Sequence, residues 1–268
     1  MAGSPRGERR TWHGVVARTQ WLTPALVRVV LTGDELRELP VLGYTDHYIK
    51  IHFPAPAGQS EGAGGRPVTR TYTIRWFDRE TNELAIDFVV HGTEGLAGPW
   101  AAAARPGDLL AFNGPGGAWG PDPTADVHLL VGDESAVPAI AAALDALPSR
   151  ATVEVFVEVE GPGFQPELRS APGTVVHWVH RGHQPYGEPL ARAVRSAPFP
   201  PGRVTAFVHG NAGMVRDLRR YLFLERALDR GDVSISGYWR TDYTEDRWQA
   251  TKGEFVAAME ADEGASVG

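Results

Sequence analysis

The stretch Arg70-Thr-Tyr-Thr-Ile-Arg-Trp-Phe77 decides the fold of the first half of the chain. Its β-branched and aromatic side chains favour a pleated strand, and a second strand of the same kind, Leu84–Val90, runs into His91-Gly92. An arginine, an aromatic ring and two hydroxyls on one short strand can bind a phosphate, cover a flat ring and offer hydrogen bonds. A flavin dinucleotide needs all three contacts, whereas an ordinary exposed strand needs none, and the tetrapeptide alone leaves both interpretations open.

Further strand patterns surround this stretch. The segment His47–Phe53 alternates, with Ile49, Ile51 and Phe53 on one face, so Lys50 is expected on the opposite face. The other strands that we expect in this half are Trp12–Thr19, Leu26–Leu31 and Asp108–Phe112. The glycine-rich segment Gln59–Pro67 indicates a mobile surface loop, and an alanine-rich turn of helix precedes Pro106.

The second half of the chain alternates strands with helices. Such alternation is typical of a parallel sheet with crossover connections, whose ligands lie at the carboxyl ends of the strands. Two glycine-containing turns, Gly132–Ser135 and Gly210–Gly213, occupy such ends. The expected helices are Pro138–Leu147 and Met214–Leu228, the latter capped by Gly231. The expected strands are Val127–Val131, Thr152–Val159, Thr174–His180, Thr205–Val208 and Asp232–Trp239.

The alternation of strands and helices begins after the stiff segment Pro121-Asp-Pro123, so we place a domain boundary near residues Asp122 to Asp126. We therefore expect a flexible leader over residues 1–11, a β domain over residues 12–123 and an α/β domain with a C-terminal extension over residues 124–268.

Composition narrows the classes of function. The chain has no cysteine, which excludes disulfides, thiolate metal sites and cysteine nucleophiles, so redox chemistry requires an organic cofactor. A formal net charge of -7 argues against nucleic-acid binding, which depends on basic surface. The polar start has no apolar core of a signal peptide, and no run reaches the roughly 18 apolar residues of a membrane span. We expect a cytoplasmic monomer that binds neither nucleic acid nor membrane.

The turn Gly132-Asp133-Glu134-Ser135 has two interpretations. Its N–H groups and the following helix could face a dinucleotide phosphate, although carboxylates there repel one; alternatively, the acids cap the helix. The dinucleotide fingerprint Gly-x-Gly-x-x-Gly is absent. Arg181 could meet the 2′-phosphate of NADPH, but Glu158 and Glu160 near another strand end would oppose it, which leaves NADH and NADPH both open.

Histidines and serines give no catalytic pattern. His177 and His180 lie on one expected strand at odd spacing, so they point to opposite faces and, with His183, do not predict a metal site. No Gly-x-Ser-x-Gly elbow is present. We expect no catalytic side chain and no metal ligand.

Seven blocks in order, from about Trp12 to Met259, make the chain resemble the siderophore-interacting protein family, whose members are FAD-dependent ferric-siderophore reductases of the ferredoxin-reductase superfamily. The blocks are Asp46–Pro54, Arg70–Arg75, Asp87–Gly92, Trp100-Ala101 with Pro106–Asp108, Gly114–Gly117, Gly132–Ile140, and Gly237–Arg240 with Thr244–Trp248.

The resemblance implies a six-stranded antiparallel flavin-binding β-barrel followed by a ferredoxin-reductase-like α/β domain for NADPH or NADH. In it, Arg70 would hold the FAD pyrophosphate, Tyr72 would pack on the isoalloxazine, and Thr73 would hydrogen-bond near N5. Lys50 and Arg240 would bind the substrate, a ferric siderophore expected to be an anionic catecholate. The remaining FAD residues would be Thr71, Asp87, Val90, His91, Gly92, Ala97 and Trp100, and those for the nicotinamide dinucleotide Gly132, Asp133, Glu134, Ser135 and Trp239, or Tyr238 in place of Trp239.

Two positions depart from the pattern of this family. Asn211 stands where many relatives carry Glu, and Asp242-Tyr243 replaces the usual Gly and basic residue after Arg240. The implied activity is electron transfer from NAD(P)H through FAD to chelated Fe(III), which releases Fe(II). A flavin reductase that serves another acceptor and a non-enzymatic siderophore carrier are the alternatives.

Overall fold

The structure, a computed structural model, describes residues 10–40, 42–54, 67–92, 95–169 and 171–265. The chain divides into two compact units, Met1–Gly120 and Pro121–Gly268. Most of the expected leader and the glycine-rich loop, residues 1–9 and 59–66, lies outside the described residues. No helix among the described residues is long and apolar enough to cross a lipid bilayer.

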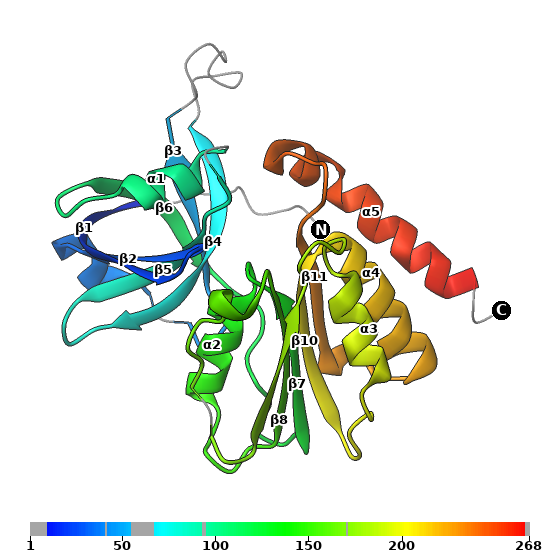
Figure 1. The fold of residues 1–268 in the computed structure, drawn as a ribbon. Helices are drawn as coiled ribbons and strands as arrows, with labels where there is room; N and C mark the ends of the chain where they lie inside the picture. Colours follow the sequence, from blue (N-terminus) through cyan, green and yellow to red (C-terminus); the bar gives the residue numbers. More distant parts are fainter. Residues whose placement is uncertain (1–9, 41, 55–66, 93–94, 170, 266–268) are drawn as a thin grey trace, which may run out of the picture. The chain divides into compact units, whose positions relative to one another are not determined.

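The first unit contains the predicted six-stranded antiparallel barrel (Figure 1). Its strands follow one another around the barrel in the order β1-β2-β5-β4-β3-β6, and pairing of Thr11 in β1 with Asn113 in β6 closes it. A short helix, α1 (Ala97–Ala103), contacts β2 and β5. The strand bounds are β1 Thr11–Thr23, β2 Leu26–Thr32, β3 Tyr48–Phe53, β4 Val68–Asp78, β5 Glu83–Val89 and β6 Leu109–Gly116.

Alternating side chains build the barrel core. In β3, Ile49 and Ile51 are fully buried and Phe53 nearly so, whereas Lys50 is exposed, as the sequence pattern predicts. Leu84, Ile86 and Phe88 of β5 are likewise buried in this core. Because the six strands close on themselves, the barrel leaves no unpaired edge between its first and last strands.

The second unit contains the predicted parallel sheet, with strand order β11-β10-β7-β8-β9. The chain order reverses between β7 and β10, so the carboxyl ends of these two strands form the switch point at which ligands bind in open α/β sheets. The strand bounds are β7 Val127–Asp133, β8 Val153–Val159, β9 Thr174–His180, β10 Val204–Asn211 and β11 Val233–Trp239.

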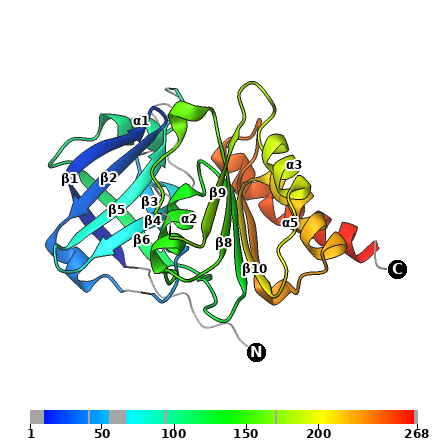
Figure 2. The same cartoon turned by 60° about the horizontal axis from the view of Figure 1, so that its bottom comes forward.

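Helices cover both faces of this sheet (Figures 1 and 2). The helix α2 (Val137–Ala146) lies on one face against β7, while α3 (Glu188–Ser196) and α4 (Ala212–Arg220) lie on the other. A 21-residue helix, α5 (Glu245–Ala265), follows β11. Its Trp248, only 1% exposed, lies against Gly237 of β11, where a Cβ atom would come within 3.0 Å of the indole.

Two features of the second unit differ from the prediction. The expected single helix Met214–Leu228 ends as α4 at Arg220 and continues as a π-helical turn, Tyr221–Glu225, in which Arg226 N–H bonds to the carbonyl of Tyr221. Ala227, with a φ of 53°, then ends the helical path, so Gly231 is not its cap. The helices α3 and α5 have no counterpart among the predicted elements.

Candidate functional site

Strand register decides which face of the barrel wall each residue of the Arg70–Thr73 motif occupies. Arg70 pairs with Ile51 and Tyr72 with Ile49, and directly opposite residues of antiparallel strands share a face, so both lie on the inner face. Thr71 pairs with Lys50 and Thr73 with Tyr48, which places the two threonines on the outer face. The guanidinium of Arg70 donates to the carbonyl of Thr69 at 2.9 Å.

Tyr72 belongs to an aromatic cluster that also contains Phe53, Phe88 and Trp100. Its ring centroid lies 4.4 Å from that of Phe88, and Trp100 lies 5.7 Å from Phe88 and 5.9 Å from Phe53. Phe53 and Phe88 are buried in the core, whereas Tyr72 and Trp100 remain half-buried. Two aromatic surfaces are therefore packed from behind and still partly accessible, which suits the binding of a flat ring.

The end of β5 contributes residues of different character. Asp87 is 3% exposed, and both of its carboxylate oxygens accept hydrogen bonds from Arg28, at 2.6 and 2.8 Å. His91 and Gly92 are exposed, and Gly92 has a φ of 59° that favours glycine. Val90 is half-buried and Ala97 is buried at the start of α1. Asp87 is thus an ion-pair partner within the barrel wall.

Lys50 lies on the outer face of β3 between two polar neighbours. Tyr48, which is 39% exposed, lies over Gly116 of β6, and His52 Nε2 is 2.6 Å from Asn113 Oδ1. Lys50 itself is exposed and pairs in register with Thr71. This face of the barrel therefore presents a cation beside a tyrosine ring.

These barrel residues fit the FAD that the sequence resemblance implies. Arg70 supplies a forked cation of the kind that binds a diphosphate, and Tyr72 on the same face supplies a half-buried ring. Gly98 allows the start of α1 to approach β5 closely beside the aromatic cluster. A Cβ on this residue would come within 3.1 Å of the carbonyl of Val89.

Asp133 joins three segments at the switch point of the second unit. Its Oδ2 accepts hydrogen bonds from Asn211 N–H at 2.7 Å and from Trp239 Nε1 at 2.8 Å. Its Oδ1 accepts from the N–H and the hydroxyl of Ser135, at 2.9 and 2.5 Å. The prediction that Asp133 or Glu134 caps the next helix is wrong: Ala136 is the N-cap residue and no side chain caps α2, because both acids are engaged elsewhere.

Glu134 belongs to a buried cluster with Arg181 and Glu158. Arg181 is 5% exposed, and its Nη1 donates to Glu134 at 3.2 and 3.3 Å and to Glu158 at 3.4 Å. Burial, with Asp133 nearby, raises the pKa of Glu134 to about 7 against the opposing effect of Arg181, and burial also raises the pKa of Glu158. In this structure Arg181 is therefore engaged by Glu134 and by Glu158, one of the two acids expected to oppose a 2′-phosphate.

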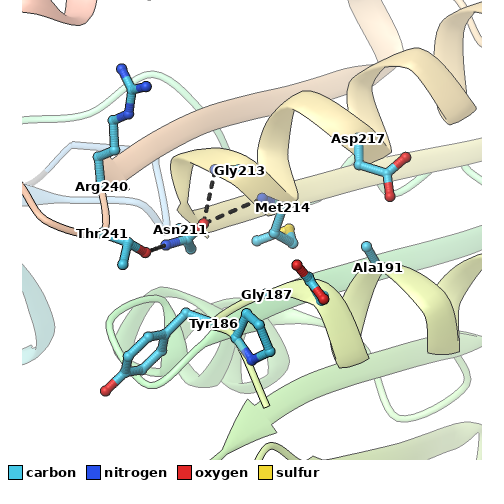
Figure 3. A pocket seen from close by; sticks show the side chains of 11 residues that line it. Tyr186, Gly187, Ala191, Asn211, Gly213, Met214, Asp217, Arg240 and Thr241 are labelled. Atoms are coloured by element: carbon cyan, nitrogen blue, oxygen red, sulfur yellow. Dashed lines mark hydrogen bonds between the residues drawn. The ribbon is translucent and has the colours of Figure 1, made fainter.

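A pocket of about 460 Å³ opens beside this cluster (Figure 3). The loop before α3 forms one wall and the start of α4 forms the other. Gly187, with a φ of 80°, is required here, since a Cβ would overlap the side chain of Met214. The lining residues are Pro185, Tyr186, Gly187, Glu188, Ala191, Asn211, Gly213, Met214, Asp217, Arg240 and Thr241.

Asn211 shapes one end of this pocket. Its Oδ1 caps α4 by accepting from Gly213 N–H at 2.8 Å and Met214 N–H at 3.4 Å, and its Nδ2 donates to the hydroxyl of Thr241 at 3.1 Å. Arg240 lies over the rings of Tyr243 and Phe255, at 4.4 and 5.4 Å from their centroids. Both departures from the family pattern thus have structural contacts of their own.

The residue after Thr241 explains one of those departures in part. Asp242 has a φ of 63°, a left-handed conformation that glycine adopts freely and aspartate tolerates better than most residues. Tyr243 lies between two guanidinium groups, with Arg240 at 4.4 Å and Arg247 at 4.1 Å. Where the family usually has a basic residue, this chain therefore has an aromatic ring that contacts two arginine cations.

The histidines at the far sheet edge are kept apart. His177 Nε2 lies 2.7 Å from Glu154, and His180 Nε2 lies 2.8 Å from Gln165. Within the described ranges, no group of three histidine, aspartate or glutamate side chains could hold a metal ion.

Sequence reasoning missed Tyr186. Its ring lies 4.0 Å from the guanidinium carbon of Arg181 and meets the ring of Trp239 edge-on, with centroids 4.9 Å apart. The signal that could have identified it is its position, because an aromatic next to a glycine in the loop after β9 lies at the carboxyl edge of a parallel sheet.

Comparisons with known proteins cover both units. Residues 15–119 match the siderophore-interacting FAD-binding domain, and residues 125–242 match the siderophore-interacting protein family. Ferric vibriobactin reductase ViuB of Vibrio cholerae is 35% identical over 86% of this chain and 90% of its own length. The NADPH-dependent ferric-chelate reductase of Escherichia coli is 30% identical over 87% of this chain and 94% of its own.

A solved structure gives the same result. The siderophore-interacting protein SipS from Aeromonas hydrophila has a TM-score of 0.81 and 31% sequence identity, over 93% of this chain and 99% of that one. The likeness in fold therefore extends over nearly the whole length of both chains. The chain belongs to the siderophore-interacting protein family.

Proposed function

We propose that the protein is a flavin-dependent ferric-siderophore reductase that passes electrons from NAD(P)H through FAD to chelated Fe(III) and releases Fe(II). The observation that carries this function is the pair Arg70 and Tyr72 on the inner face of β4, beside a half-buried aromatic cluster, within a domain that matches the family's FAD-binding domain. The names of the ferric vibriobactin and ferric-chelate reductases support the same activity.

The proposed FAD site uses the barrel residues described above. Arg70 binds the diphosphate, Tyr72 packs on the isoalloxazine and Thr73 hydrogen-bonds near N5, with Thr71 next to it. Asp87, Val90, His91, Gly92, Ala97 and Trp100 form the surroundings of the ribityl, phosphate and adenine groups. Bound FAD supplies the conversion of a two-electron hydride into single electrons, so one nicotinamide nucleotide reduces two ferric ions and is itself oxidised with release of one proton.

The side chains of the protein bind and orient in this reaction and need donate no proton or nucleophile. The nicotinamide dinucleotide is proposed to bind along the carboxyl edge of the sheet, at Gly132–Ser135 and Trp239, where the strand order reverses. Lys50 and Arg240 bind the ferric siderophore, proposed to be an anionic catecholate because Lys50 presents an exposed charge beside Tyr48 on a chain of net charge -7. We further propose that the protein acts as a cytoplasmic monomer.

Replacement of Arg70 tests the proposal. Purified protein is expected to be yellow, and Arg70→Ala is expected to weaken FAD binding ~10- to 100-fold, on the scale of a lost charge-assisted contact to a phosphate. Arg70→Lys should restore part of the affinity, since a point charge replaces the fork. Arg105→Ala, an exposed arginine of the same unit, serves as the control and should keep its FAD.

The acceptor separates this function from its alternatives. With the FAD-loaded protein and a nicotinamide nucleotide, a ferric catecholate is expected to be reduced faster than free flavin, with Fe(II) trapped by a chromogenic chelator. Folded protein that stays colourless and takes up no FAD would show a carrier without flavin. Reduction of free flavin alone would show a reductase for another acceptor.

A further inference from the structure

Arg181 directly follows β9 at the carboxyl edge of the sheet. An arginine at this edge could bind the 2′-phosphate of a nucleotide. In the structure its guanidinium is enclosed. Its Nη1 donates hydrogen bonds to Glu134 and Glu158, and its central carbon lies 4.0 Å from the centroid of the Tyr186 ring. Only 5% of Arg181 is exposed. A phosphate can therefore reach this arginine only after the cluster is taken apart.

Glu158 fixes the cluster in place. Its side chain is fully buried, and besides Arg181 it accepts hydrogen bonds from Gly187 N–H at 3.0 Å and Leu190 N–H at 3.3 Å, at the start of α3. Withdrawal of Arg181 would leave Glu158 and Glu134 as buried carboxylates without their cation, and removal of one partner from a buried ion pair is strongly destabilising. The raised pKa values of both carboxyls agree with this, since Arg181 already offsets only part of their burial.

The adjacent pocket has an acidic wall. Glu188 at the start of α3 and Asp217 on α4 both line it, and Asp217 lies 3.4 Å from Arg195. Its lining cation, Arg240, stacks on Tyr243 and Phe255, and in Figure 3 its side chain points away from Tyr186 and Gly187. A 2′-phosphate carries about -1.5 to -2 charges and is repelled here, whereas a neutral ribose 2′-hydroxyl can donate a hydrogen bond to a carboxylate.

We propose that this chain takes NADH in preference to NADPH, because Glu134 and Glu158 hold Arg181 and the pocket beside it is lined by Glu188 and Asp217. The inference rests on the proposed function, in which a nicotinamide dinucleotide binds at the carboxyl edge of this sheet. It separates the chain from its Escherichia coli relative, whose name specifies NADPH. Arg192 of α3, which donates to Gln184 in the loop before this helix at 3.3 Å, is the competing cation.

Two measurements on the full FAD-loaded protein test this preference. In anaerobic stopped-flow reduction, NADH should reduce the FAD with at least ~10-fold higher kred/Kd than NADPH. By calorimetry, which needs no turnover, 2′,5′-ADP should bind at least ~10-fold more weakly than 5′-AMP, a difference of about 1.4 kcal/mol. Tighter binding of 2′,5′-ADP, whether through Arg181 or Arg192, overturns the inference.

Variants identify the residues responsible. Glu134→Gln removes one of the two charges that hold Arg181, so the ratio of 2′,5′-ADP affinity to 5′-AMP affinity should rise at least ~5-fold. Glu188→Gln, an exposed pocket residue whose replacement leaves the core intact, should raise this ratio as well. The control Glu154→Gln makes the same charge change at the opposite end of β8 and should alter neither ligand. If wild type prefers 5′-AMP but neither variant changes that preference, the assignment to these acids is wrong.

The outcomes distinguish this inference from the proposed function. Preference for NADPH with normal reduction of the ferric siderophore overturns the inference alone. Reduction of FAD by dithionite but by neither nucleotide overturns the nicotinamide donor in the proposed function and the inference with it.

Discussion

Oδ2 of Asp133, at the end of β7, accepts a hydrogen bond from the indole Nε1 of Trp239, at the end of β11, over 2.8 Å. The two residues are 106 positions apart in sequence, and β10 runs between their strands. The same oxygen binds the backbone of Asn211 in that middle strand. A single buried carboxylate therefore fixes three strand ends at the switch point and sets the orientation of the indole that we propose lies at the dinucleotide site.

Removal of this carboxylate should destabilise the second unit. Asp133→Ala leaves the buried N–H of Asn211 and the indole N–H without their acceptor, so we expect the free energy of unfolding to fall by about 2–4 kcal/mol. Urea denaturation followed by circular dichroism measures the change. Glu254→Gln on the exposed side of α5 is the charge-matched control and should stay within about 0.5 kcal/mol of wild type. Equal stability of Asp133→Ala and wild type would show that the junction does not hold the sheet edge.

Stability should also depend on the protonation of Glu134. Its pKa in the folded protein is about 7, above the ordinary value of 4.5, so the folded state binds more protons than the unfolded state between these values. The stability that this group contributes is then greatest below pH 4.5 and is lost as the pH rises through 7, by about 3 kcal/mol in all. Urea denaturation of wild type and Glu134→Gln at pH 5 and pH 8 tests this. From pH 5 to pH 8, the free energy of unfolding of the variant should rise relative to that of wild type. A pH-independent difference between the two proteins would refute this.

Two ion pairs in the barrel wall differ in their burial and can be compared. Arg28 and Asp87 have side chains 20% and 2% exposed, whereas Arg18 and Glu83 are 52% and 22% exposed. Arg28→Met leaves the Asp87 carboxylate buried without its cation and should lower the free energy of unfolding by about 3–5 kcal/mol. Arg18→Met should lower it by at most about 1 kcal/mol. Chemical denaturation of both variants, with FAD present in equal excess, measures the difference.

Asp87 also tests how the FAD site is assigned. Since both carboxylate oxygens are bound by Arg28, Asp87→Asn should reduce stability more than it reduces the FAD affinity of the folded protein, which we expect within ~3-fold of wild type. Fluorescence titration of FAD at a temperature where the variant is folded measures that affinity. A loss of 100-fold or more, on the order of a lost charge-assisted contact, would instead make Asp87 a direct FAD ligand.

The individual strands and the parallel sheet were predictable because they carry local signals, whereas the closure of six strands into a barrel was implied only by the resemblance to the family. Alternation in β3 and the largely apolar run of β7 indicate strands and their burial without knowledge of any partner. The helix α5 was missed because polar residues occupy part of its packed side. Lys252 donates to Ser236 of β11, and Glu263, 3% exposed, binds Arg219 and Arg230, so the spacing Trp248, Phe255, Met259 lacks two of the expected apolar positions.

The sequence predicts which segments meet at the candidate site, but it does not predict which side chains bind one another there. The sequence indicates that Gly132–Ser135 and Gly210–Gly213 share an edge, since both follow strands of one parallel sheet. Arg181 binds Glu134 and Glu158, which lie 47 and 23 residues away in sequence on other segments. The fold buries these three side chains together. Such a choice depends on tertiary packing, which no local pattern of the chain reports.

Lys50 provides the test of substrate charge. Lys50→Glu reverses an exposed charge on the outer face of β3, so the apparent affinity for an anionic ferric catecholate should fall ~10-fold or more while FAD content stays unchanged. Because exposed charges are screened, the difference from wild type should shrink as ionic strength rises from about 0.01 to 1 M. Arg105→Glu, an exposed residue of the same unit with the same change of charge, controls for the net charge of the protein. Tryptophan fluorescence quenching by the ferric siderophore measures binding, and an affinity equal in wild type and Lys50→Glu removes Lys50 from the substrate site.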